Sequence, residues 1–116
     1  MKPFFDNPEQ DVHNVTTCNL YANVLLTHQV VKTFKKRYEE SGKRSAILFT
    51  SAMAALAPVP GVGVYAASKI ATDFVAWGLQ YELARYKVDV SAVRAAGVST
   101  NIIGNPEPSL AVATPQ

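Results

Sequence analysis

The chain has 116 residues, 48% of them apolar, and a net charge of +2. This length forms one small domain with a core of its own, and the apolar content excludes a disordered chain. The charge is too small to indicate a nucleic-acid partner, and no apolar run reaches the ~18 residues that a membrane-spanning helix requires.

The N-terminal residues Met-Lys-Pro-Phe-Phe-Asp lack the apolar core of a signal peptide. Cys18 is the only cysteine, which leaves no intramolecular disulfide and no cysteine metal site. His13 and His28 lie too far apart in the sequence to indicate a metal site. We therefore expect no bound metal and a reducing location that faces the cytosol.

The first long element is predicted to be a helix from about Pro8 to Ser41, with a break near residues 14–17. Its apolar residues recur at helical spacing along one face, at Leu20, Val24, Val31, Phe34 and Tyr38. Further apolar residues widen this face, so the helix is expected to be covered on two sides. Gly42 has the position and the residue type that commonly end a helix.

A basic cluster lies near the end of this helix, and it has two interpretations. Its members are Lys32, Lys35, Lys36 and Arg37. The cluster could bind an anionic partner or a membrane surface. Alternatively, it is a solvated last turn that complements the helix dipole, with two glutamates interspersed. The second interpretation is favoured.

The second half of the chain alternates between strand and helix patterns. Residues 45–50 form a short apolar run, which predicts a buried strand. Residues 51–63 contain two prolines and two glycines and are expected to form a loop. An alanine-rich helix follows from about Val64 to Tyr86, and residues 88–93 read as a second strand. The order helix, strand, helix, strand predicts an α/β layer with parallel strands.

The end of the chain is predicted to be irregular. Residues 98–104 are expected to form a partly apolar loop. Residues 105–116 contain three prolines and are expected to form a flexible tail. The domain is therefore predicted to span residues 1–104.

Tyr65 and Lys69 are the most informative pair, because four residues place them one turn apart on the same helix face. A free phenol ionises only near pH ~10 and is a poor acid or base at neutral pH. An ammonium group held beside a phenol favours the phenolate, so that a proton can be exchanged with a carbonyl or hydroxyl substrate. Ser51, at the end of the apolar run, offers a hydroxyl that could hold the substrate oxygen. Asn19 lies further upstream, in the first helix.

This set of residues resembles the short-chain dehydrogenase/reductase family, in which Tyr-x-x-x-Lys follows a serine at a strand end. The segments Thr50–Leu56, Pro58–Pro60 and Val64–Lys69 are similar to one branch of that family, the 17β-hydroxysteroid dehydrogenases and very-long-chain 3-oxoacyl-CoA reductases. The resemblance covers roughly residues 15–103. It implies a partial Rossmann-like α/β fold, a doubly wound parallel sheet in three layers, without the N-terminal βαβ units.

The resemblance also implies a role for each site residue. Tyr65 would be the catalytic acid/base, and Lys69 would support it and bind the nicotinamide ribose. Ser51 would orient the substrate oxygen, Asn19 would hold a water molecule of a proton relay, and Thr100 would contact the cofactor. The implied cofactor is NADP(H), with NAD as the alternative.

The chain departs from the family pattern at three places. Ser51 lies fourteen residues before Tyr65, whereas the family's usual spacing is thirteen and would select Ala52. Ala95 stands where the family usually has a proline. The family's glycine-rich phosphate-binding turn precedes the asparagine helix, but the first glycine here is Gly42.

We therefore expect an oxidoreductase that reduces a ketone or oxidises a hydroxyl on a lipid-like substrate, such as a 3-oxoacyl-CoA or a steroid. The isolated chain is expected to bind NADP(H) poorly and to be nearly inactive. The alternative is a non-catalytic truncated paralogue that acts as an interaction module. In the family, the helices that match residues 15–41 and 64–86 build a homo-oligomer interface. The branch implies the cytosolic face of the endoplasmic reticulum, with the cytoplasm as the alternative.

Overall fold

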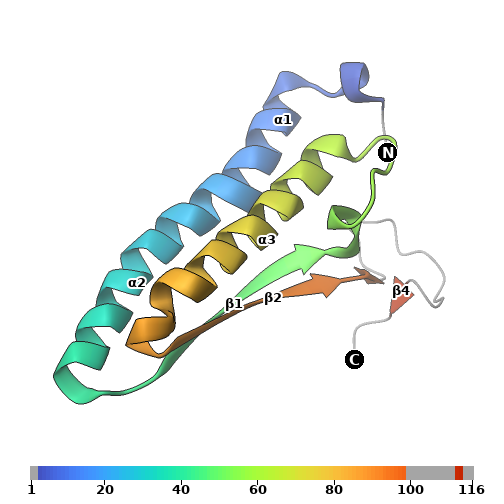
Figure 1. The fold of residues 1–116 in the computed structure, drawn as a ribbon. Helices are drawn as coiled ribbons and strands as arrows, with labels where there is room; N and C mark the ends of the chain where they lie inside the picture. The colour runs from blue at the N-terminus through green and yellow to red at the C-terminus, as the bar shows by residue number, and fades with distance from the viewer. Residues whose placement is uncertain (1–2, 99–111, 114–116) are drawn as a thin grey trace.

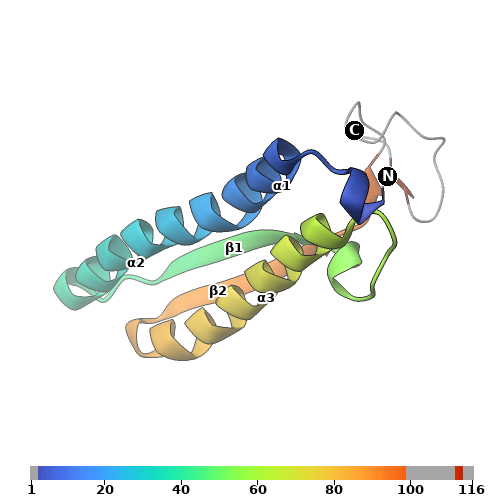
Figure 2. The same cartoon turned by 90° about the horizontal axis from the view of Figure 1, so that it is seen from above.

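The computed structural model describes residues 3–98 and 112–113. Two long helical elements lie side by side over one face of a two-stranded parallel sheet (Figure 1). Seen from above, the strands run between and beneath these two helical elements (Figure 2). The described part of the chain therefore forms two layers, one of helices and one of strands.

The first helical element is continuous but contains one wide turn. After a short 3-10 turn, η1 (Phe4–Asp6), it begins as α1 (Glu9–Thr16). It passes through a π-helical segment, η2 (Thr17–Tyr21), into α2 (Ala22–Ser41). The break predicted near residues 14–17 is therefore wrong: the helix continues, and a π turn that begins at Thr17 widens the chain by one residue.

α2 ends where the sequence predicts. Gly42 adopts a left-handed conformation (φ 66°), and its N–H donates to the Tyr38 carbonyl at 2.7 Å. Glycine reaches this conformation without the steric cost that a Cβ atom adds. The chain can therefore turn sharply from the helix into the first strand.

The sheet consists of β1 (Ser45–Ala52) and β2 (Val88–Ala95), which pair in parallel along their whole length. The connection between them contains η3 (Met53–Ala55), α3 (Gly63–Leu83) and the short turn η4 (Ala84–Tyr86). The two predicted strands and the second predicted helix are confirmed. Both strands continue two residues further than predicted, so Ser51 and Ala52 belong to the strand and not to the loop.

The core lies between the sheet and the helices. Its buried members are Phe49, Ala76, Leu83, Val88 and Val90. Strand side chains alternate between the two faces of the sheet, so the residues next to these point away from the helices. Leu48, for example, is 67% exposed, and the facing side of the sheet is open in the described residues.

The predicted α/β arrangement with parallel strands is confirmed. A second, very short parallel pair joins β3 (Gly97–Val98) to β4 (Val112–Ala113). The rest of the predicted loop and tail, residues 99–111 and 114–116, lies outside the described residues. Among the helices that the structure describes, none has the length and apolar character to cross a bilayer.

Candidate active site

Tyr65 and Lys69 lie on the first two turns of α3, beside the end of β1. The Lys69 Nζ atom is 5.7 Å from the centroid of the Tyr65 ring. Lys69 Nζ also donates a hydrogen bond to the Thr50 carbonyl at 3.0 Å. Tyr65 is 38% exposed, so its ring is accessible from solvent. The predicted pairing of a phenol with an ammonium group is present in the structure.

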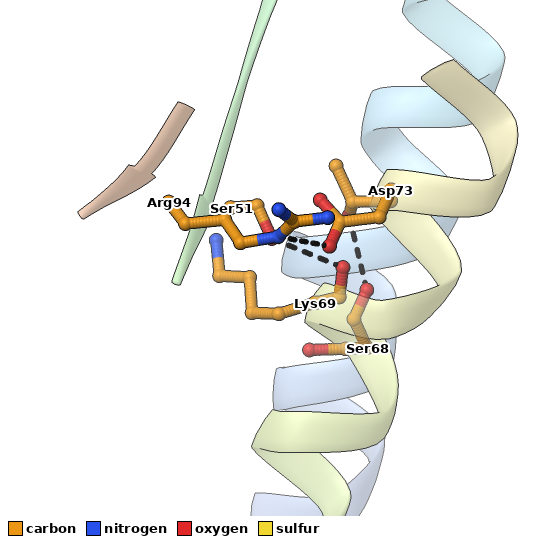
Figure 3. Close-up of polar contacts among 6 residues, drawn as sticks. Ser51, Ser68, Lys69, Asp73 and Arg94 are labelled. Atoms are coloured by element: carbon orange, nitrogen blue, oxygen red, sulfur yellow. Dashed lines mark hydrogen bonds and ion pairs between the residues drawn. The ribbon is translucent and has the colours of Figure 1, made fainter. Parts of the chain in front are cut away.

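Ser51 takes a different direction from the one that its predicted role requires. Its side chain is only 2% exposed, and its hydroxyl donates to the Lys69 backbone carbonyl at 3.2 Å. Figure 3 shows this contact, which fixes the end of β1 to α3. No hydrogen bond joins Ser51 to Tyr65 among the described residues. Ser51 faces the helices because it shares a strand face with Phe49.

Asn19 reaches the site from the π turn. Its side-chain amide donates to the Ser68 hydroxyl at 3.2 Å, and that hydroxyl donates to the Tyr65 carbonyl at 2.6 Å. The backbone carbonyl of Asn19 accepts a hydrogen bond from the Asn23 side-chain amide at 2.7 Å. Asn19 is therefore tied to the Tyr65 turn of α3 through Ser68.

Ser68 and Asn23 make site contacts that were not predicted from the sequence. Ser68 is buried at 3% exposure in the turn between Tyr65 and Lys69. A serine on the buried face of an alanine-rich helix is a usable signal, because a hydroxyl in such a place needs a partner. Asn23 could not be recognised in this way, because it lies on a partly exposed turn, where an amide needs no partner within the protein. Thr100, the predicted cofactor contact, lies outside the described residues.

An ion pair between a buried aspartate and a half-buried arginine lies one turn beyond Lys69. Asp73 is 4% exposed, and its Oδ2 atom accepts a hydrogen bond from Arg94 Nε at 2.9 Å. The Arg94 guanidinium also lies 5.8 Å from the centre of the Trp77 ring. Figure 3 shows that this pair crosses from α3 to the end of β2, next to the Ser51 contact. The pair was not predicted from the sequence, although each of two apolar elements contains a charged residue, Asp73 and Arg94.

The chemistry available at the site is proton transfer through a phenol with a neighbouring cation. Within the described residues, no three His, Cys, Asp or Glu side chains are placed to hold a metal ion. Tyr65, which is partly exposed, carries a hydroxyl that could exchange a proton with a bound carbonyl or alcohol.

A comparison with protein families assigns residues 1–109 to the short chain dehydrogenase model. The chain belongs to the short-chain dehydrogenase family. A curated relative of this short-chain dehydrogenase chain is 17-beta-hydroxysteroid dehydrogenase type 3 of Danio rerio. The two are 28% identical over 106 residues, which cover 91% of this chain and 33% of the relative. The chain thus spans about a third of the length of that relative.

Solved structures of the family confirm the fold of this short-chain dehydrogenase chain. It matches a 3-ketoacyl-(acyl-carrier-protein) reductase from Brucella melitensis with a TM-score of 0.83 and 22% identity, over 90% of this chain and 43% of the reductase. It matches a gluconate 5-dehydrogenase from Burkholderia cenocepacia J2315 with a TM-score of 0.80 and 18% identity, over 89% of this chain and 38% of the dehydrogenase. The predicted Rossmann-like fold is therefore confirmed, with this chain forming part of it.

Proposed function

We propose that the chain is the proton-transfer part of an oxidoreductase that interconverts a ketone and a hydroxyl group. The observation that carries this proposal is the exposed Tyr65 ring with Lys69 Nζ 5.7 Å from its centre. The Asn19–Ser68 contact adds support, because it links a third predicted site residue to the same turn of α3. In a reduction, the Tyr65 hydroxyl gives its proton to the developing alkoxide, and Lys69 stabilises the resulting phenolate.

The proposed cofactor is NADP(H), with NAD as the alternative. The chemistry that it supplies when bound is hydride transfer to or from the substrate carbon. Lys69, Tyr65 and Thr100 would hold its nicotinamide end. Lys69 fits this role if its ammonium group leaves the Thr50 carbonyl, which it contacts at 3.0 Å. The pyrophosphate has no corresponding glycine-rich turn here, because the first glycine, Gly42, ends α2.

The proposed substrate is lipid-like, such as a 3-oxoacyl-CoA or a steroid. Its support is the sequence similarity to a hydroxysteroid dehydrogenase, at 28% identity. A shallow pocket of about 300 Å³ beside the predicted loop is consistent with an apolar ligand, because its lining includes Leu56, Pro58, Val59 and Ile70. The cytosolic face of the endoplasmic reticulum is the proposed location, and it rests on the branch resemblance alone.

A second candidate function is a non-catalytic interaction module. The observation that favours it is that three predicted polar groups already have partners inside the chain. Ser51 donates to the Lys69 carbonyl, Lys69 to the Thr50 carbonyl, and the Asn19 amide to Ser68. A site in which these groups serve the fold can persist after catalysis has been lost.

The homo-oligomer expected through residues 15–41 and 64–86 is also a proposal. Its support is a stripe of exposed apolar side chains at helical spacing along α3, namely Ile70, Phe74, Trp77 and Tyr81. Tyr21 and Leu26 are also exposed, at 64% each, on the neighbouring helical element. An apolar stripe of this kind is typical of a helix that packs against another protein surface.

The test of the enzyme proposal has two parts. The isolated 116-residue polypeptide is expected to show no saturable NADPH binding in the micromolar range by isothermal titration calorimetry. A polypeptide that also contains a phosphate-binding half of the fold is expected to turn over ketone substrates. In that polypeptide, Tyr65→Phe should lower kcat by about 100-fold or more and leave the melting temperature unchanged.

The outcomes separate the two candidate functions. Retained turnover in Tyr65→Phe would remove Tyr65 from the proposed mechanism. Absence of turnover in the longer polypeptide, together with a normal circular dichroism spectrum, would favour the interaction module. Tight NADPH binding by the isolated chain would contradict the expectation that it lacks a pyrophosphate site.

A further inference from the structure

The positive charge of the molecule is concentrated at one end. The last turns of α2, the loop that follows it, η4 and the start of β2 meet there (Figure 1). Residues 32–44 and 82–89, which we call the basic end, contain eight basic and four acidic side chains. The basic end therefore has a net charge of +4, while the whole chain has +2. The rest of the chain has more acidic than basic residues. The net positive charge of the protein therefore comes from the basic end.

Few of these cations are neutralised by the fold. Three of the acidic side chains of the basic end form ion pairs, Glu39 and Glu40 at 3.8 and 3.7 Å and Asp89 at 2.8 Å. All three pairs are exposed, and exposed pairs cancel little charge. Within the described residues, five cations of the basic end have no carboxylate within 4.0 Å: Lys32, Arg37, Lys43, Arg85 and Lys87.

Lys87 is held in a conformation that a lysine does not favour. It has φ 50° and ψ 41°, and it is the only non-glycine residue with positive φ among those described. Its N–H donates to the Ala84 carbonyl, and its carbonyl accepts from Ser45, so the turn requires this conformation. A glycine would make the same turn without steric cost. The chain thus keeps a cation at a position where the backbone favours a residue without a side chain.

Two further cations are gathered around one aromatic ring. Lys35 Nζ lies 5.5 Å from the centre of the Tyr86 ring, and the Arg85 guanidinium lies 4.8 Å from it. Tyr38 packs against the same ring edge-on, at 6.3 Å between centroids. Cation–π attraction offsets the repulsion between the two like charges. The side chains from α2 and η4 are thereby held together at the basic end.

We propose that the basic end docks on an anionic lipid surface. Its cations come from three separate segments, so a broad anionic surface can contact them together, and each cation adds to the attraction. A small anion bound in a pocket would fit the basic end less well than a surface does, because a pocket brings only a few of these cations together. The hollow at this end, of about 430 Å³, is bordered by Arg44 and Lys87 but also by the Asp89 carboxylate. The attraction acts within about a Debye length of the membrane and weakens as salt is added.

The experiment is vesicle co-sedimentation of the 116-residue chain. Vesicles of phosphatidylcholine are compared with vesicles that contain 30% phosphatidylserine, at ~50 and ~300 mM salt. We expect binding only to the anionic vesicles and weaker binding at the higher salt. The measurement does not depend on cofactor or turnover, so it stands or falls separately from the proposed oxidoreductase activity.

Two charge-removing variants and one matched control test whether the named cations bind the vesicles. The triple variant Lys32→Gln, Arg37→Gln, Lys43→Gln should weaken partitioning by about 100-fold, from about 5-fold for each cation. Its matched control, Lys32→Arg, Arg37→Lys, Lys43→Arg, keeps the charge and should bind like the original chain. Lys87→Gly should weaken binding by about 5-fold and at the same time raise the melting temperature, because it removes the unfavourable conformation. Weaker binding in a more stable protein cannot come from unfolding.

Three results would overturn the proposal. The first is equal binding to neutral and anionic vesicles. The second is unchanged vesicle binding in the triple glutamine variant. The third is tight binding to soluble heparin without binding to anionic vesicles, which would assign the basic end to a polyanion other than a lipid surface.

Discussion

At the scale of residues, the site is held together by side chains that bond to backbone atoms. Ser51 and Lys69 form a double connection, since the Ser51 hydroxyl donates to the Lys69 carbonyl and the Lys69 ammonium donates to the Thr50 carbonyl. These two bonds fix the first turns of α3 against the end of β1. Ser51 was predicted as a substrate contact because it stands at the end of an apolar run, as the serine of the family does, and its strand was predicted to end two residues too early. With the strand extended to Ala52, side-chain alternation from Phe49 turns Ser51 toward the helices.

The Asp73–Arg94 pair should make the largest single-residue contribution to stability near the site. Arg94→Ala leaves the Asp73 carboxylate buried without a cation and is expected to lower the free energy of unfolding by about 3 kcal/mol. Arg94→Lys, which keeps a cation, should cost less. Equilibrium urea unfolding followed by circular dichroism measures both changes.

The Arg44–Asp89 pair supplies the control for that experiment. Its side chains are 69% and 65% exposed, although its shortest N···O distance is 2.8 Å. Arg44→Ala should therefore cost less than about 1 kcal/mol. Equal effects of Arg44→Ala and Arg94→Ala would show that burial does not set the energy of these pairs. The partner of Arg94 was not predictable, because it lies 21 residues away in a different element.

At the scale of elements, the hydrophobic period predicted the helices and the two strands, and Gly42 was predicted as the end of the first helical element. The π turn at η2 was not recognised as such. Because a π turn takes up its extra residue by widening, it leaves no interruption in the sequence pattern that would mark residues 17–21. The position of the turn follows from tertiary contacts such as that between Asn19 and Ser68, which no local pattern contains.

Two glycine substitutions should have opposite effects on stability. Gly42→Ala places a Cβ atom on a residue with φ 66° and is expected to destabilise the chain by about 1 kcal/mol. Gly78→Ala lies inside α3 and should stabilise it by about 0.5–1 kcal/mol, because alanine is the better helix former. No neighbouring atom lies within 4 Å of the added Cβ at either position, so packing does not interfere. Thermal unfolding of the two variants measures the difference, and a shift of the same sign in both would contradict it.

At the scale of the whole molecule, two apolar surfaces have no cover among the described residues. One is the α3 stripe that includes Phe74 and Tyr81, and the other is the sheet face that includes Leu48 and Val93. β1 also pairs with β2 along one edge only. An open edge and an apolar face promote association with other chains.

We expect the proposed homo-oligomer to form through the α3 stripe. Phe74→Glu with Tyr81→Glu places charge on side chains that are 64% and 85% exposed, and it should convert the oligomer to a monomer. Sedimentation velocity measures the change, and circular dichroism checks the fold. Leu48→Glu on the sheet face is the control and should leave the oligomer intact. Association that is lost in Leu48→Glu but kept in the double variant would place the contact on the sheet instead.

The π turn also has a consequence for how this gene can change. Deleting any one codon between positions 17 and 21 would restore an uninterrupted α-helix, so an in-frame loss there is structurally easier than elsewhere in the long helix. The cost would be local, because the wide turn already absorbs the extra residue, and its loss would change the turn around Asn19 while the segments on either side keep nearly the same rotation about the helix axis. A descendant with that deletion would keep its helix and the face that α1 turns toward α3, but it would lose the present placement of Asn19 against Ser68.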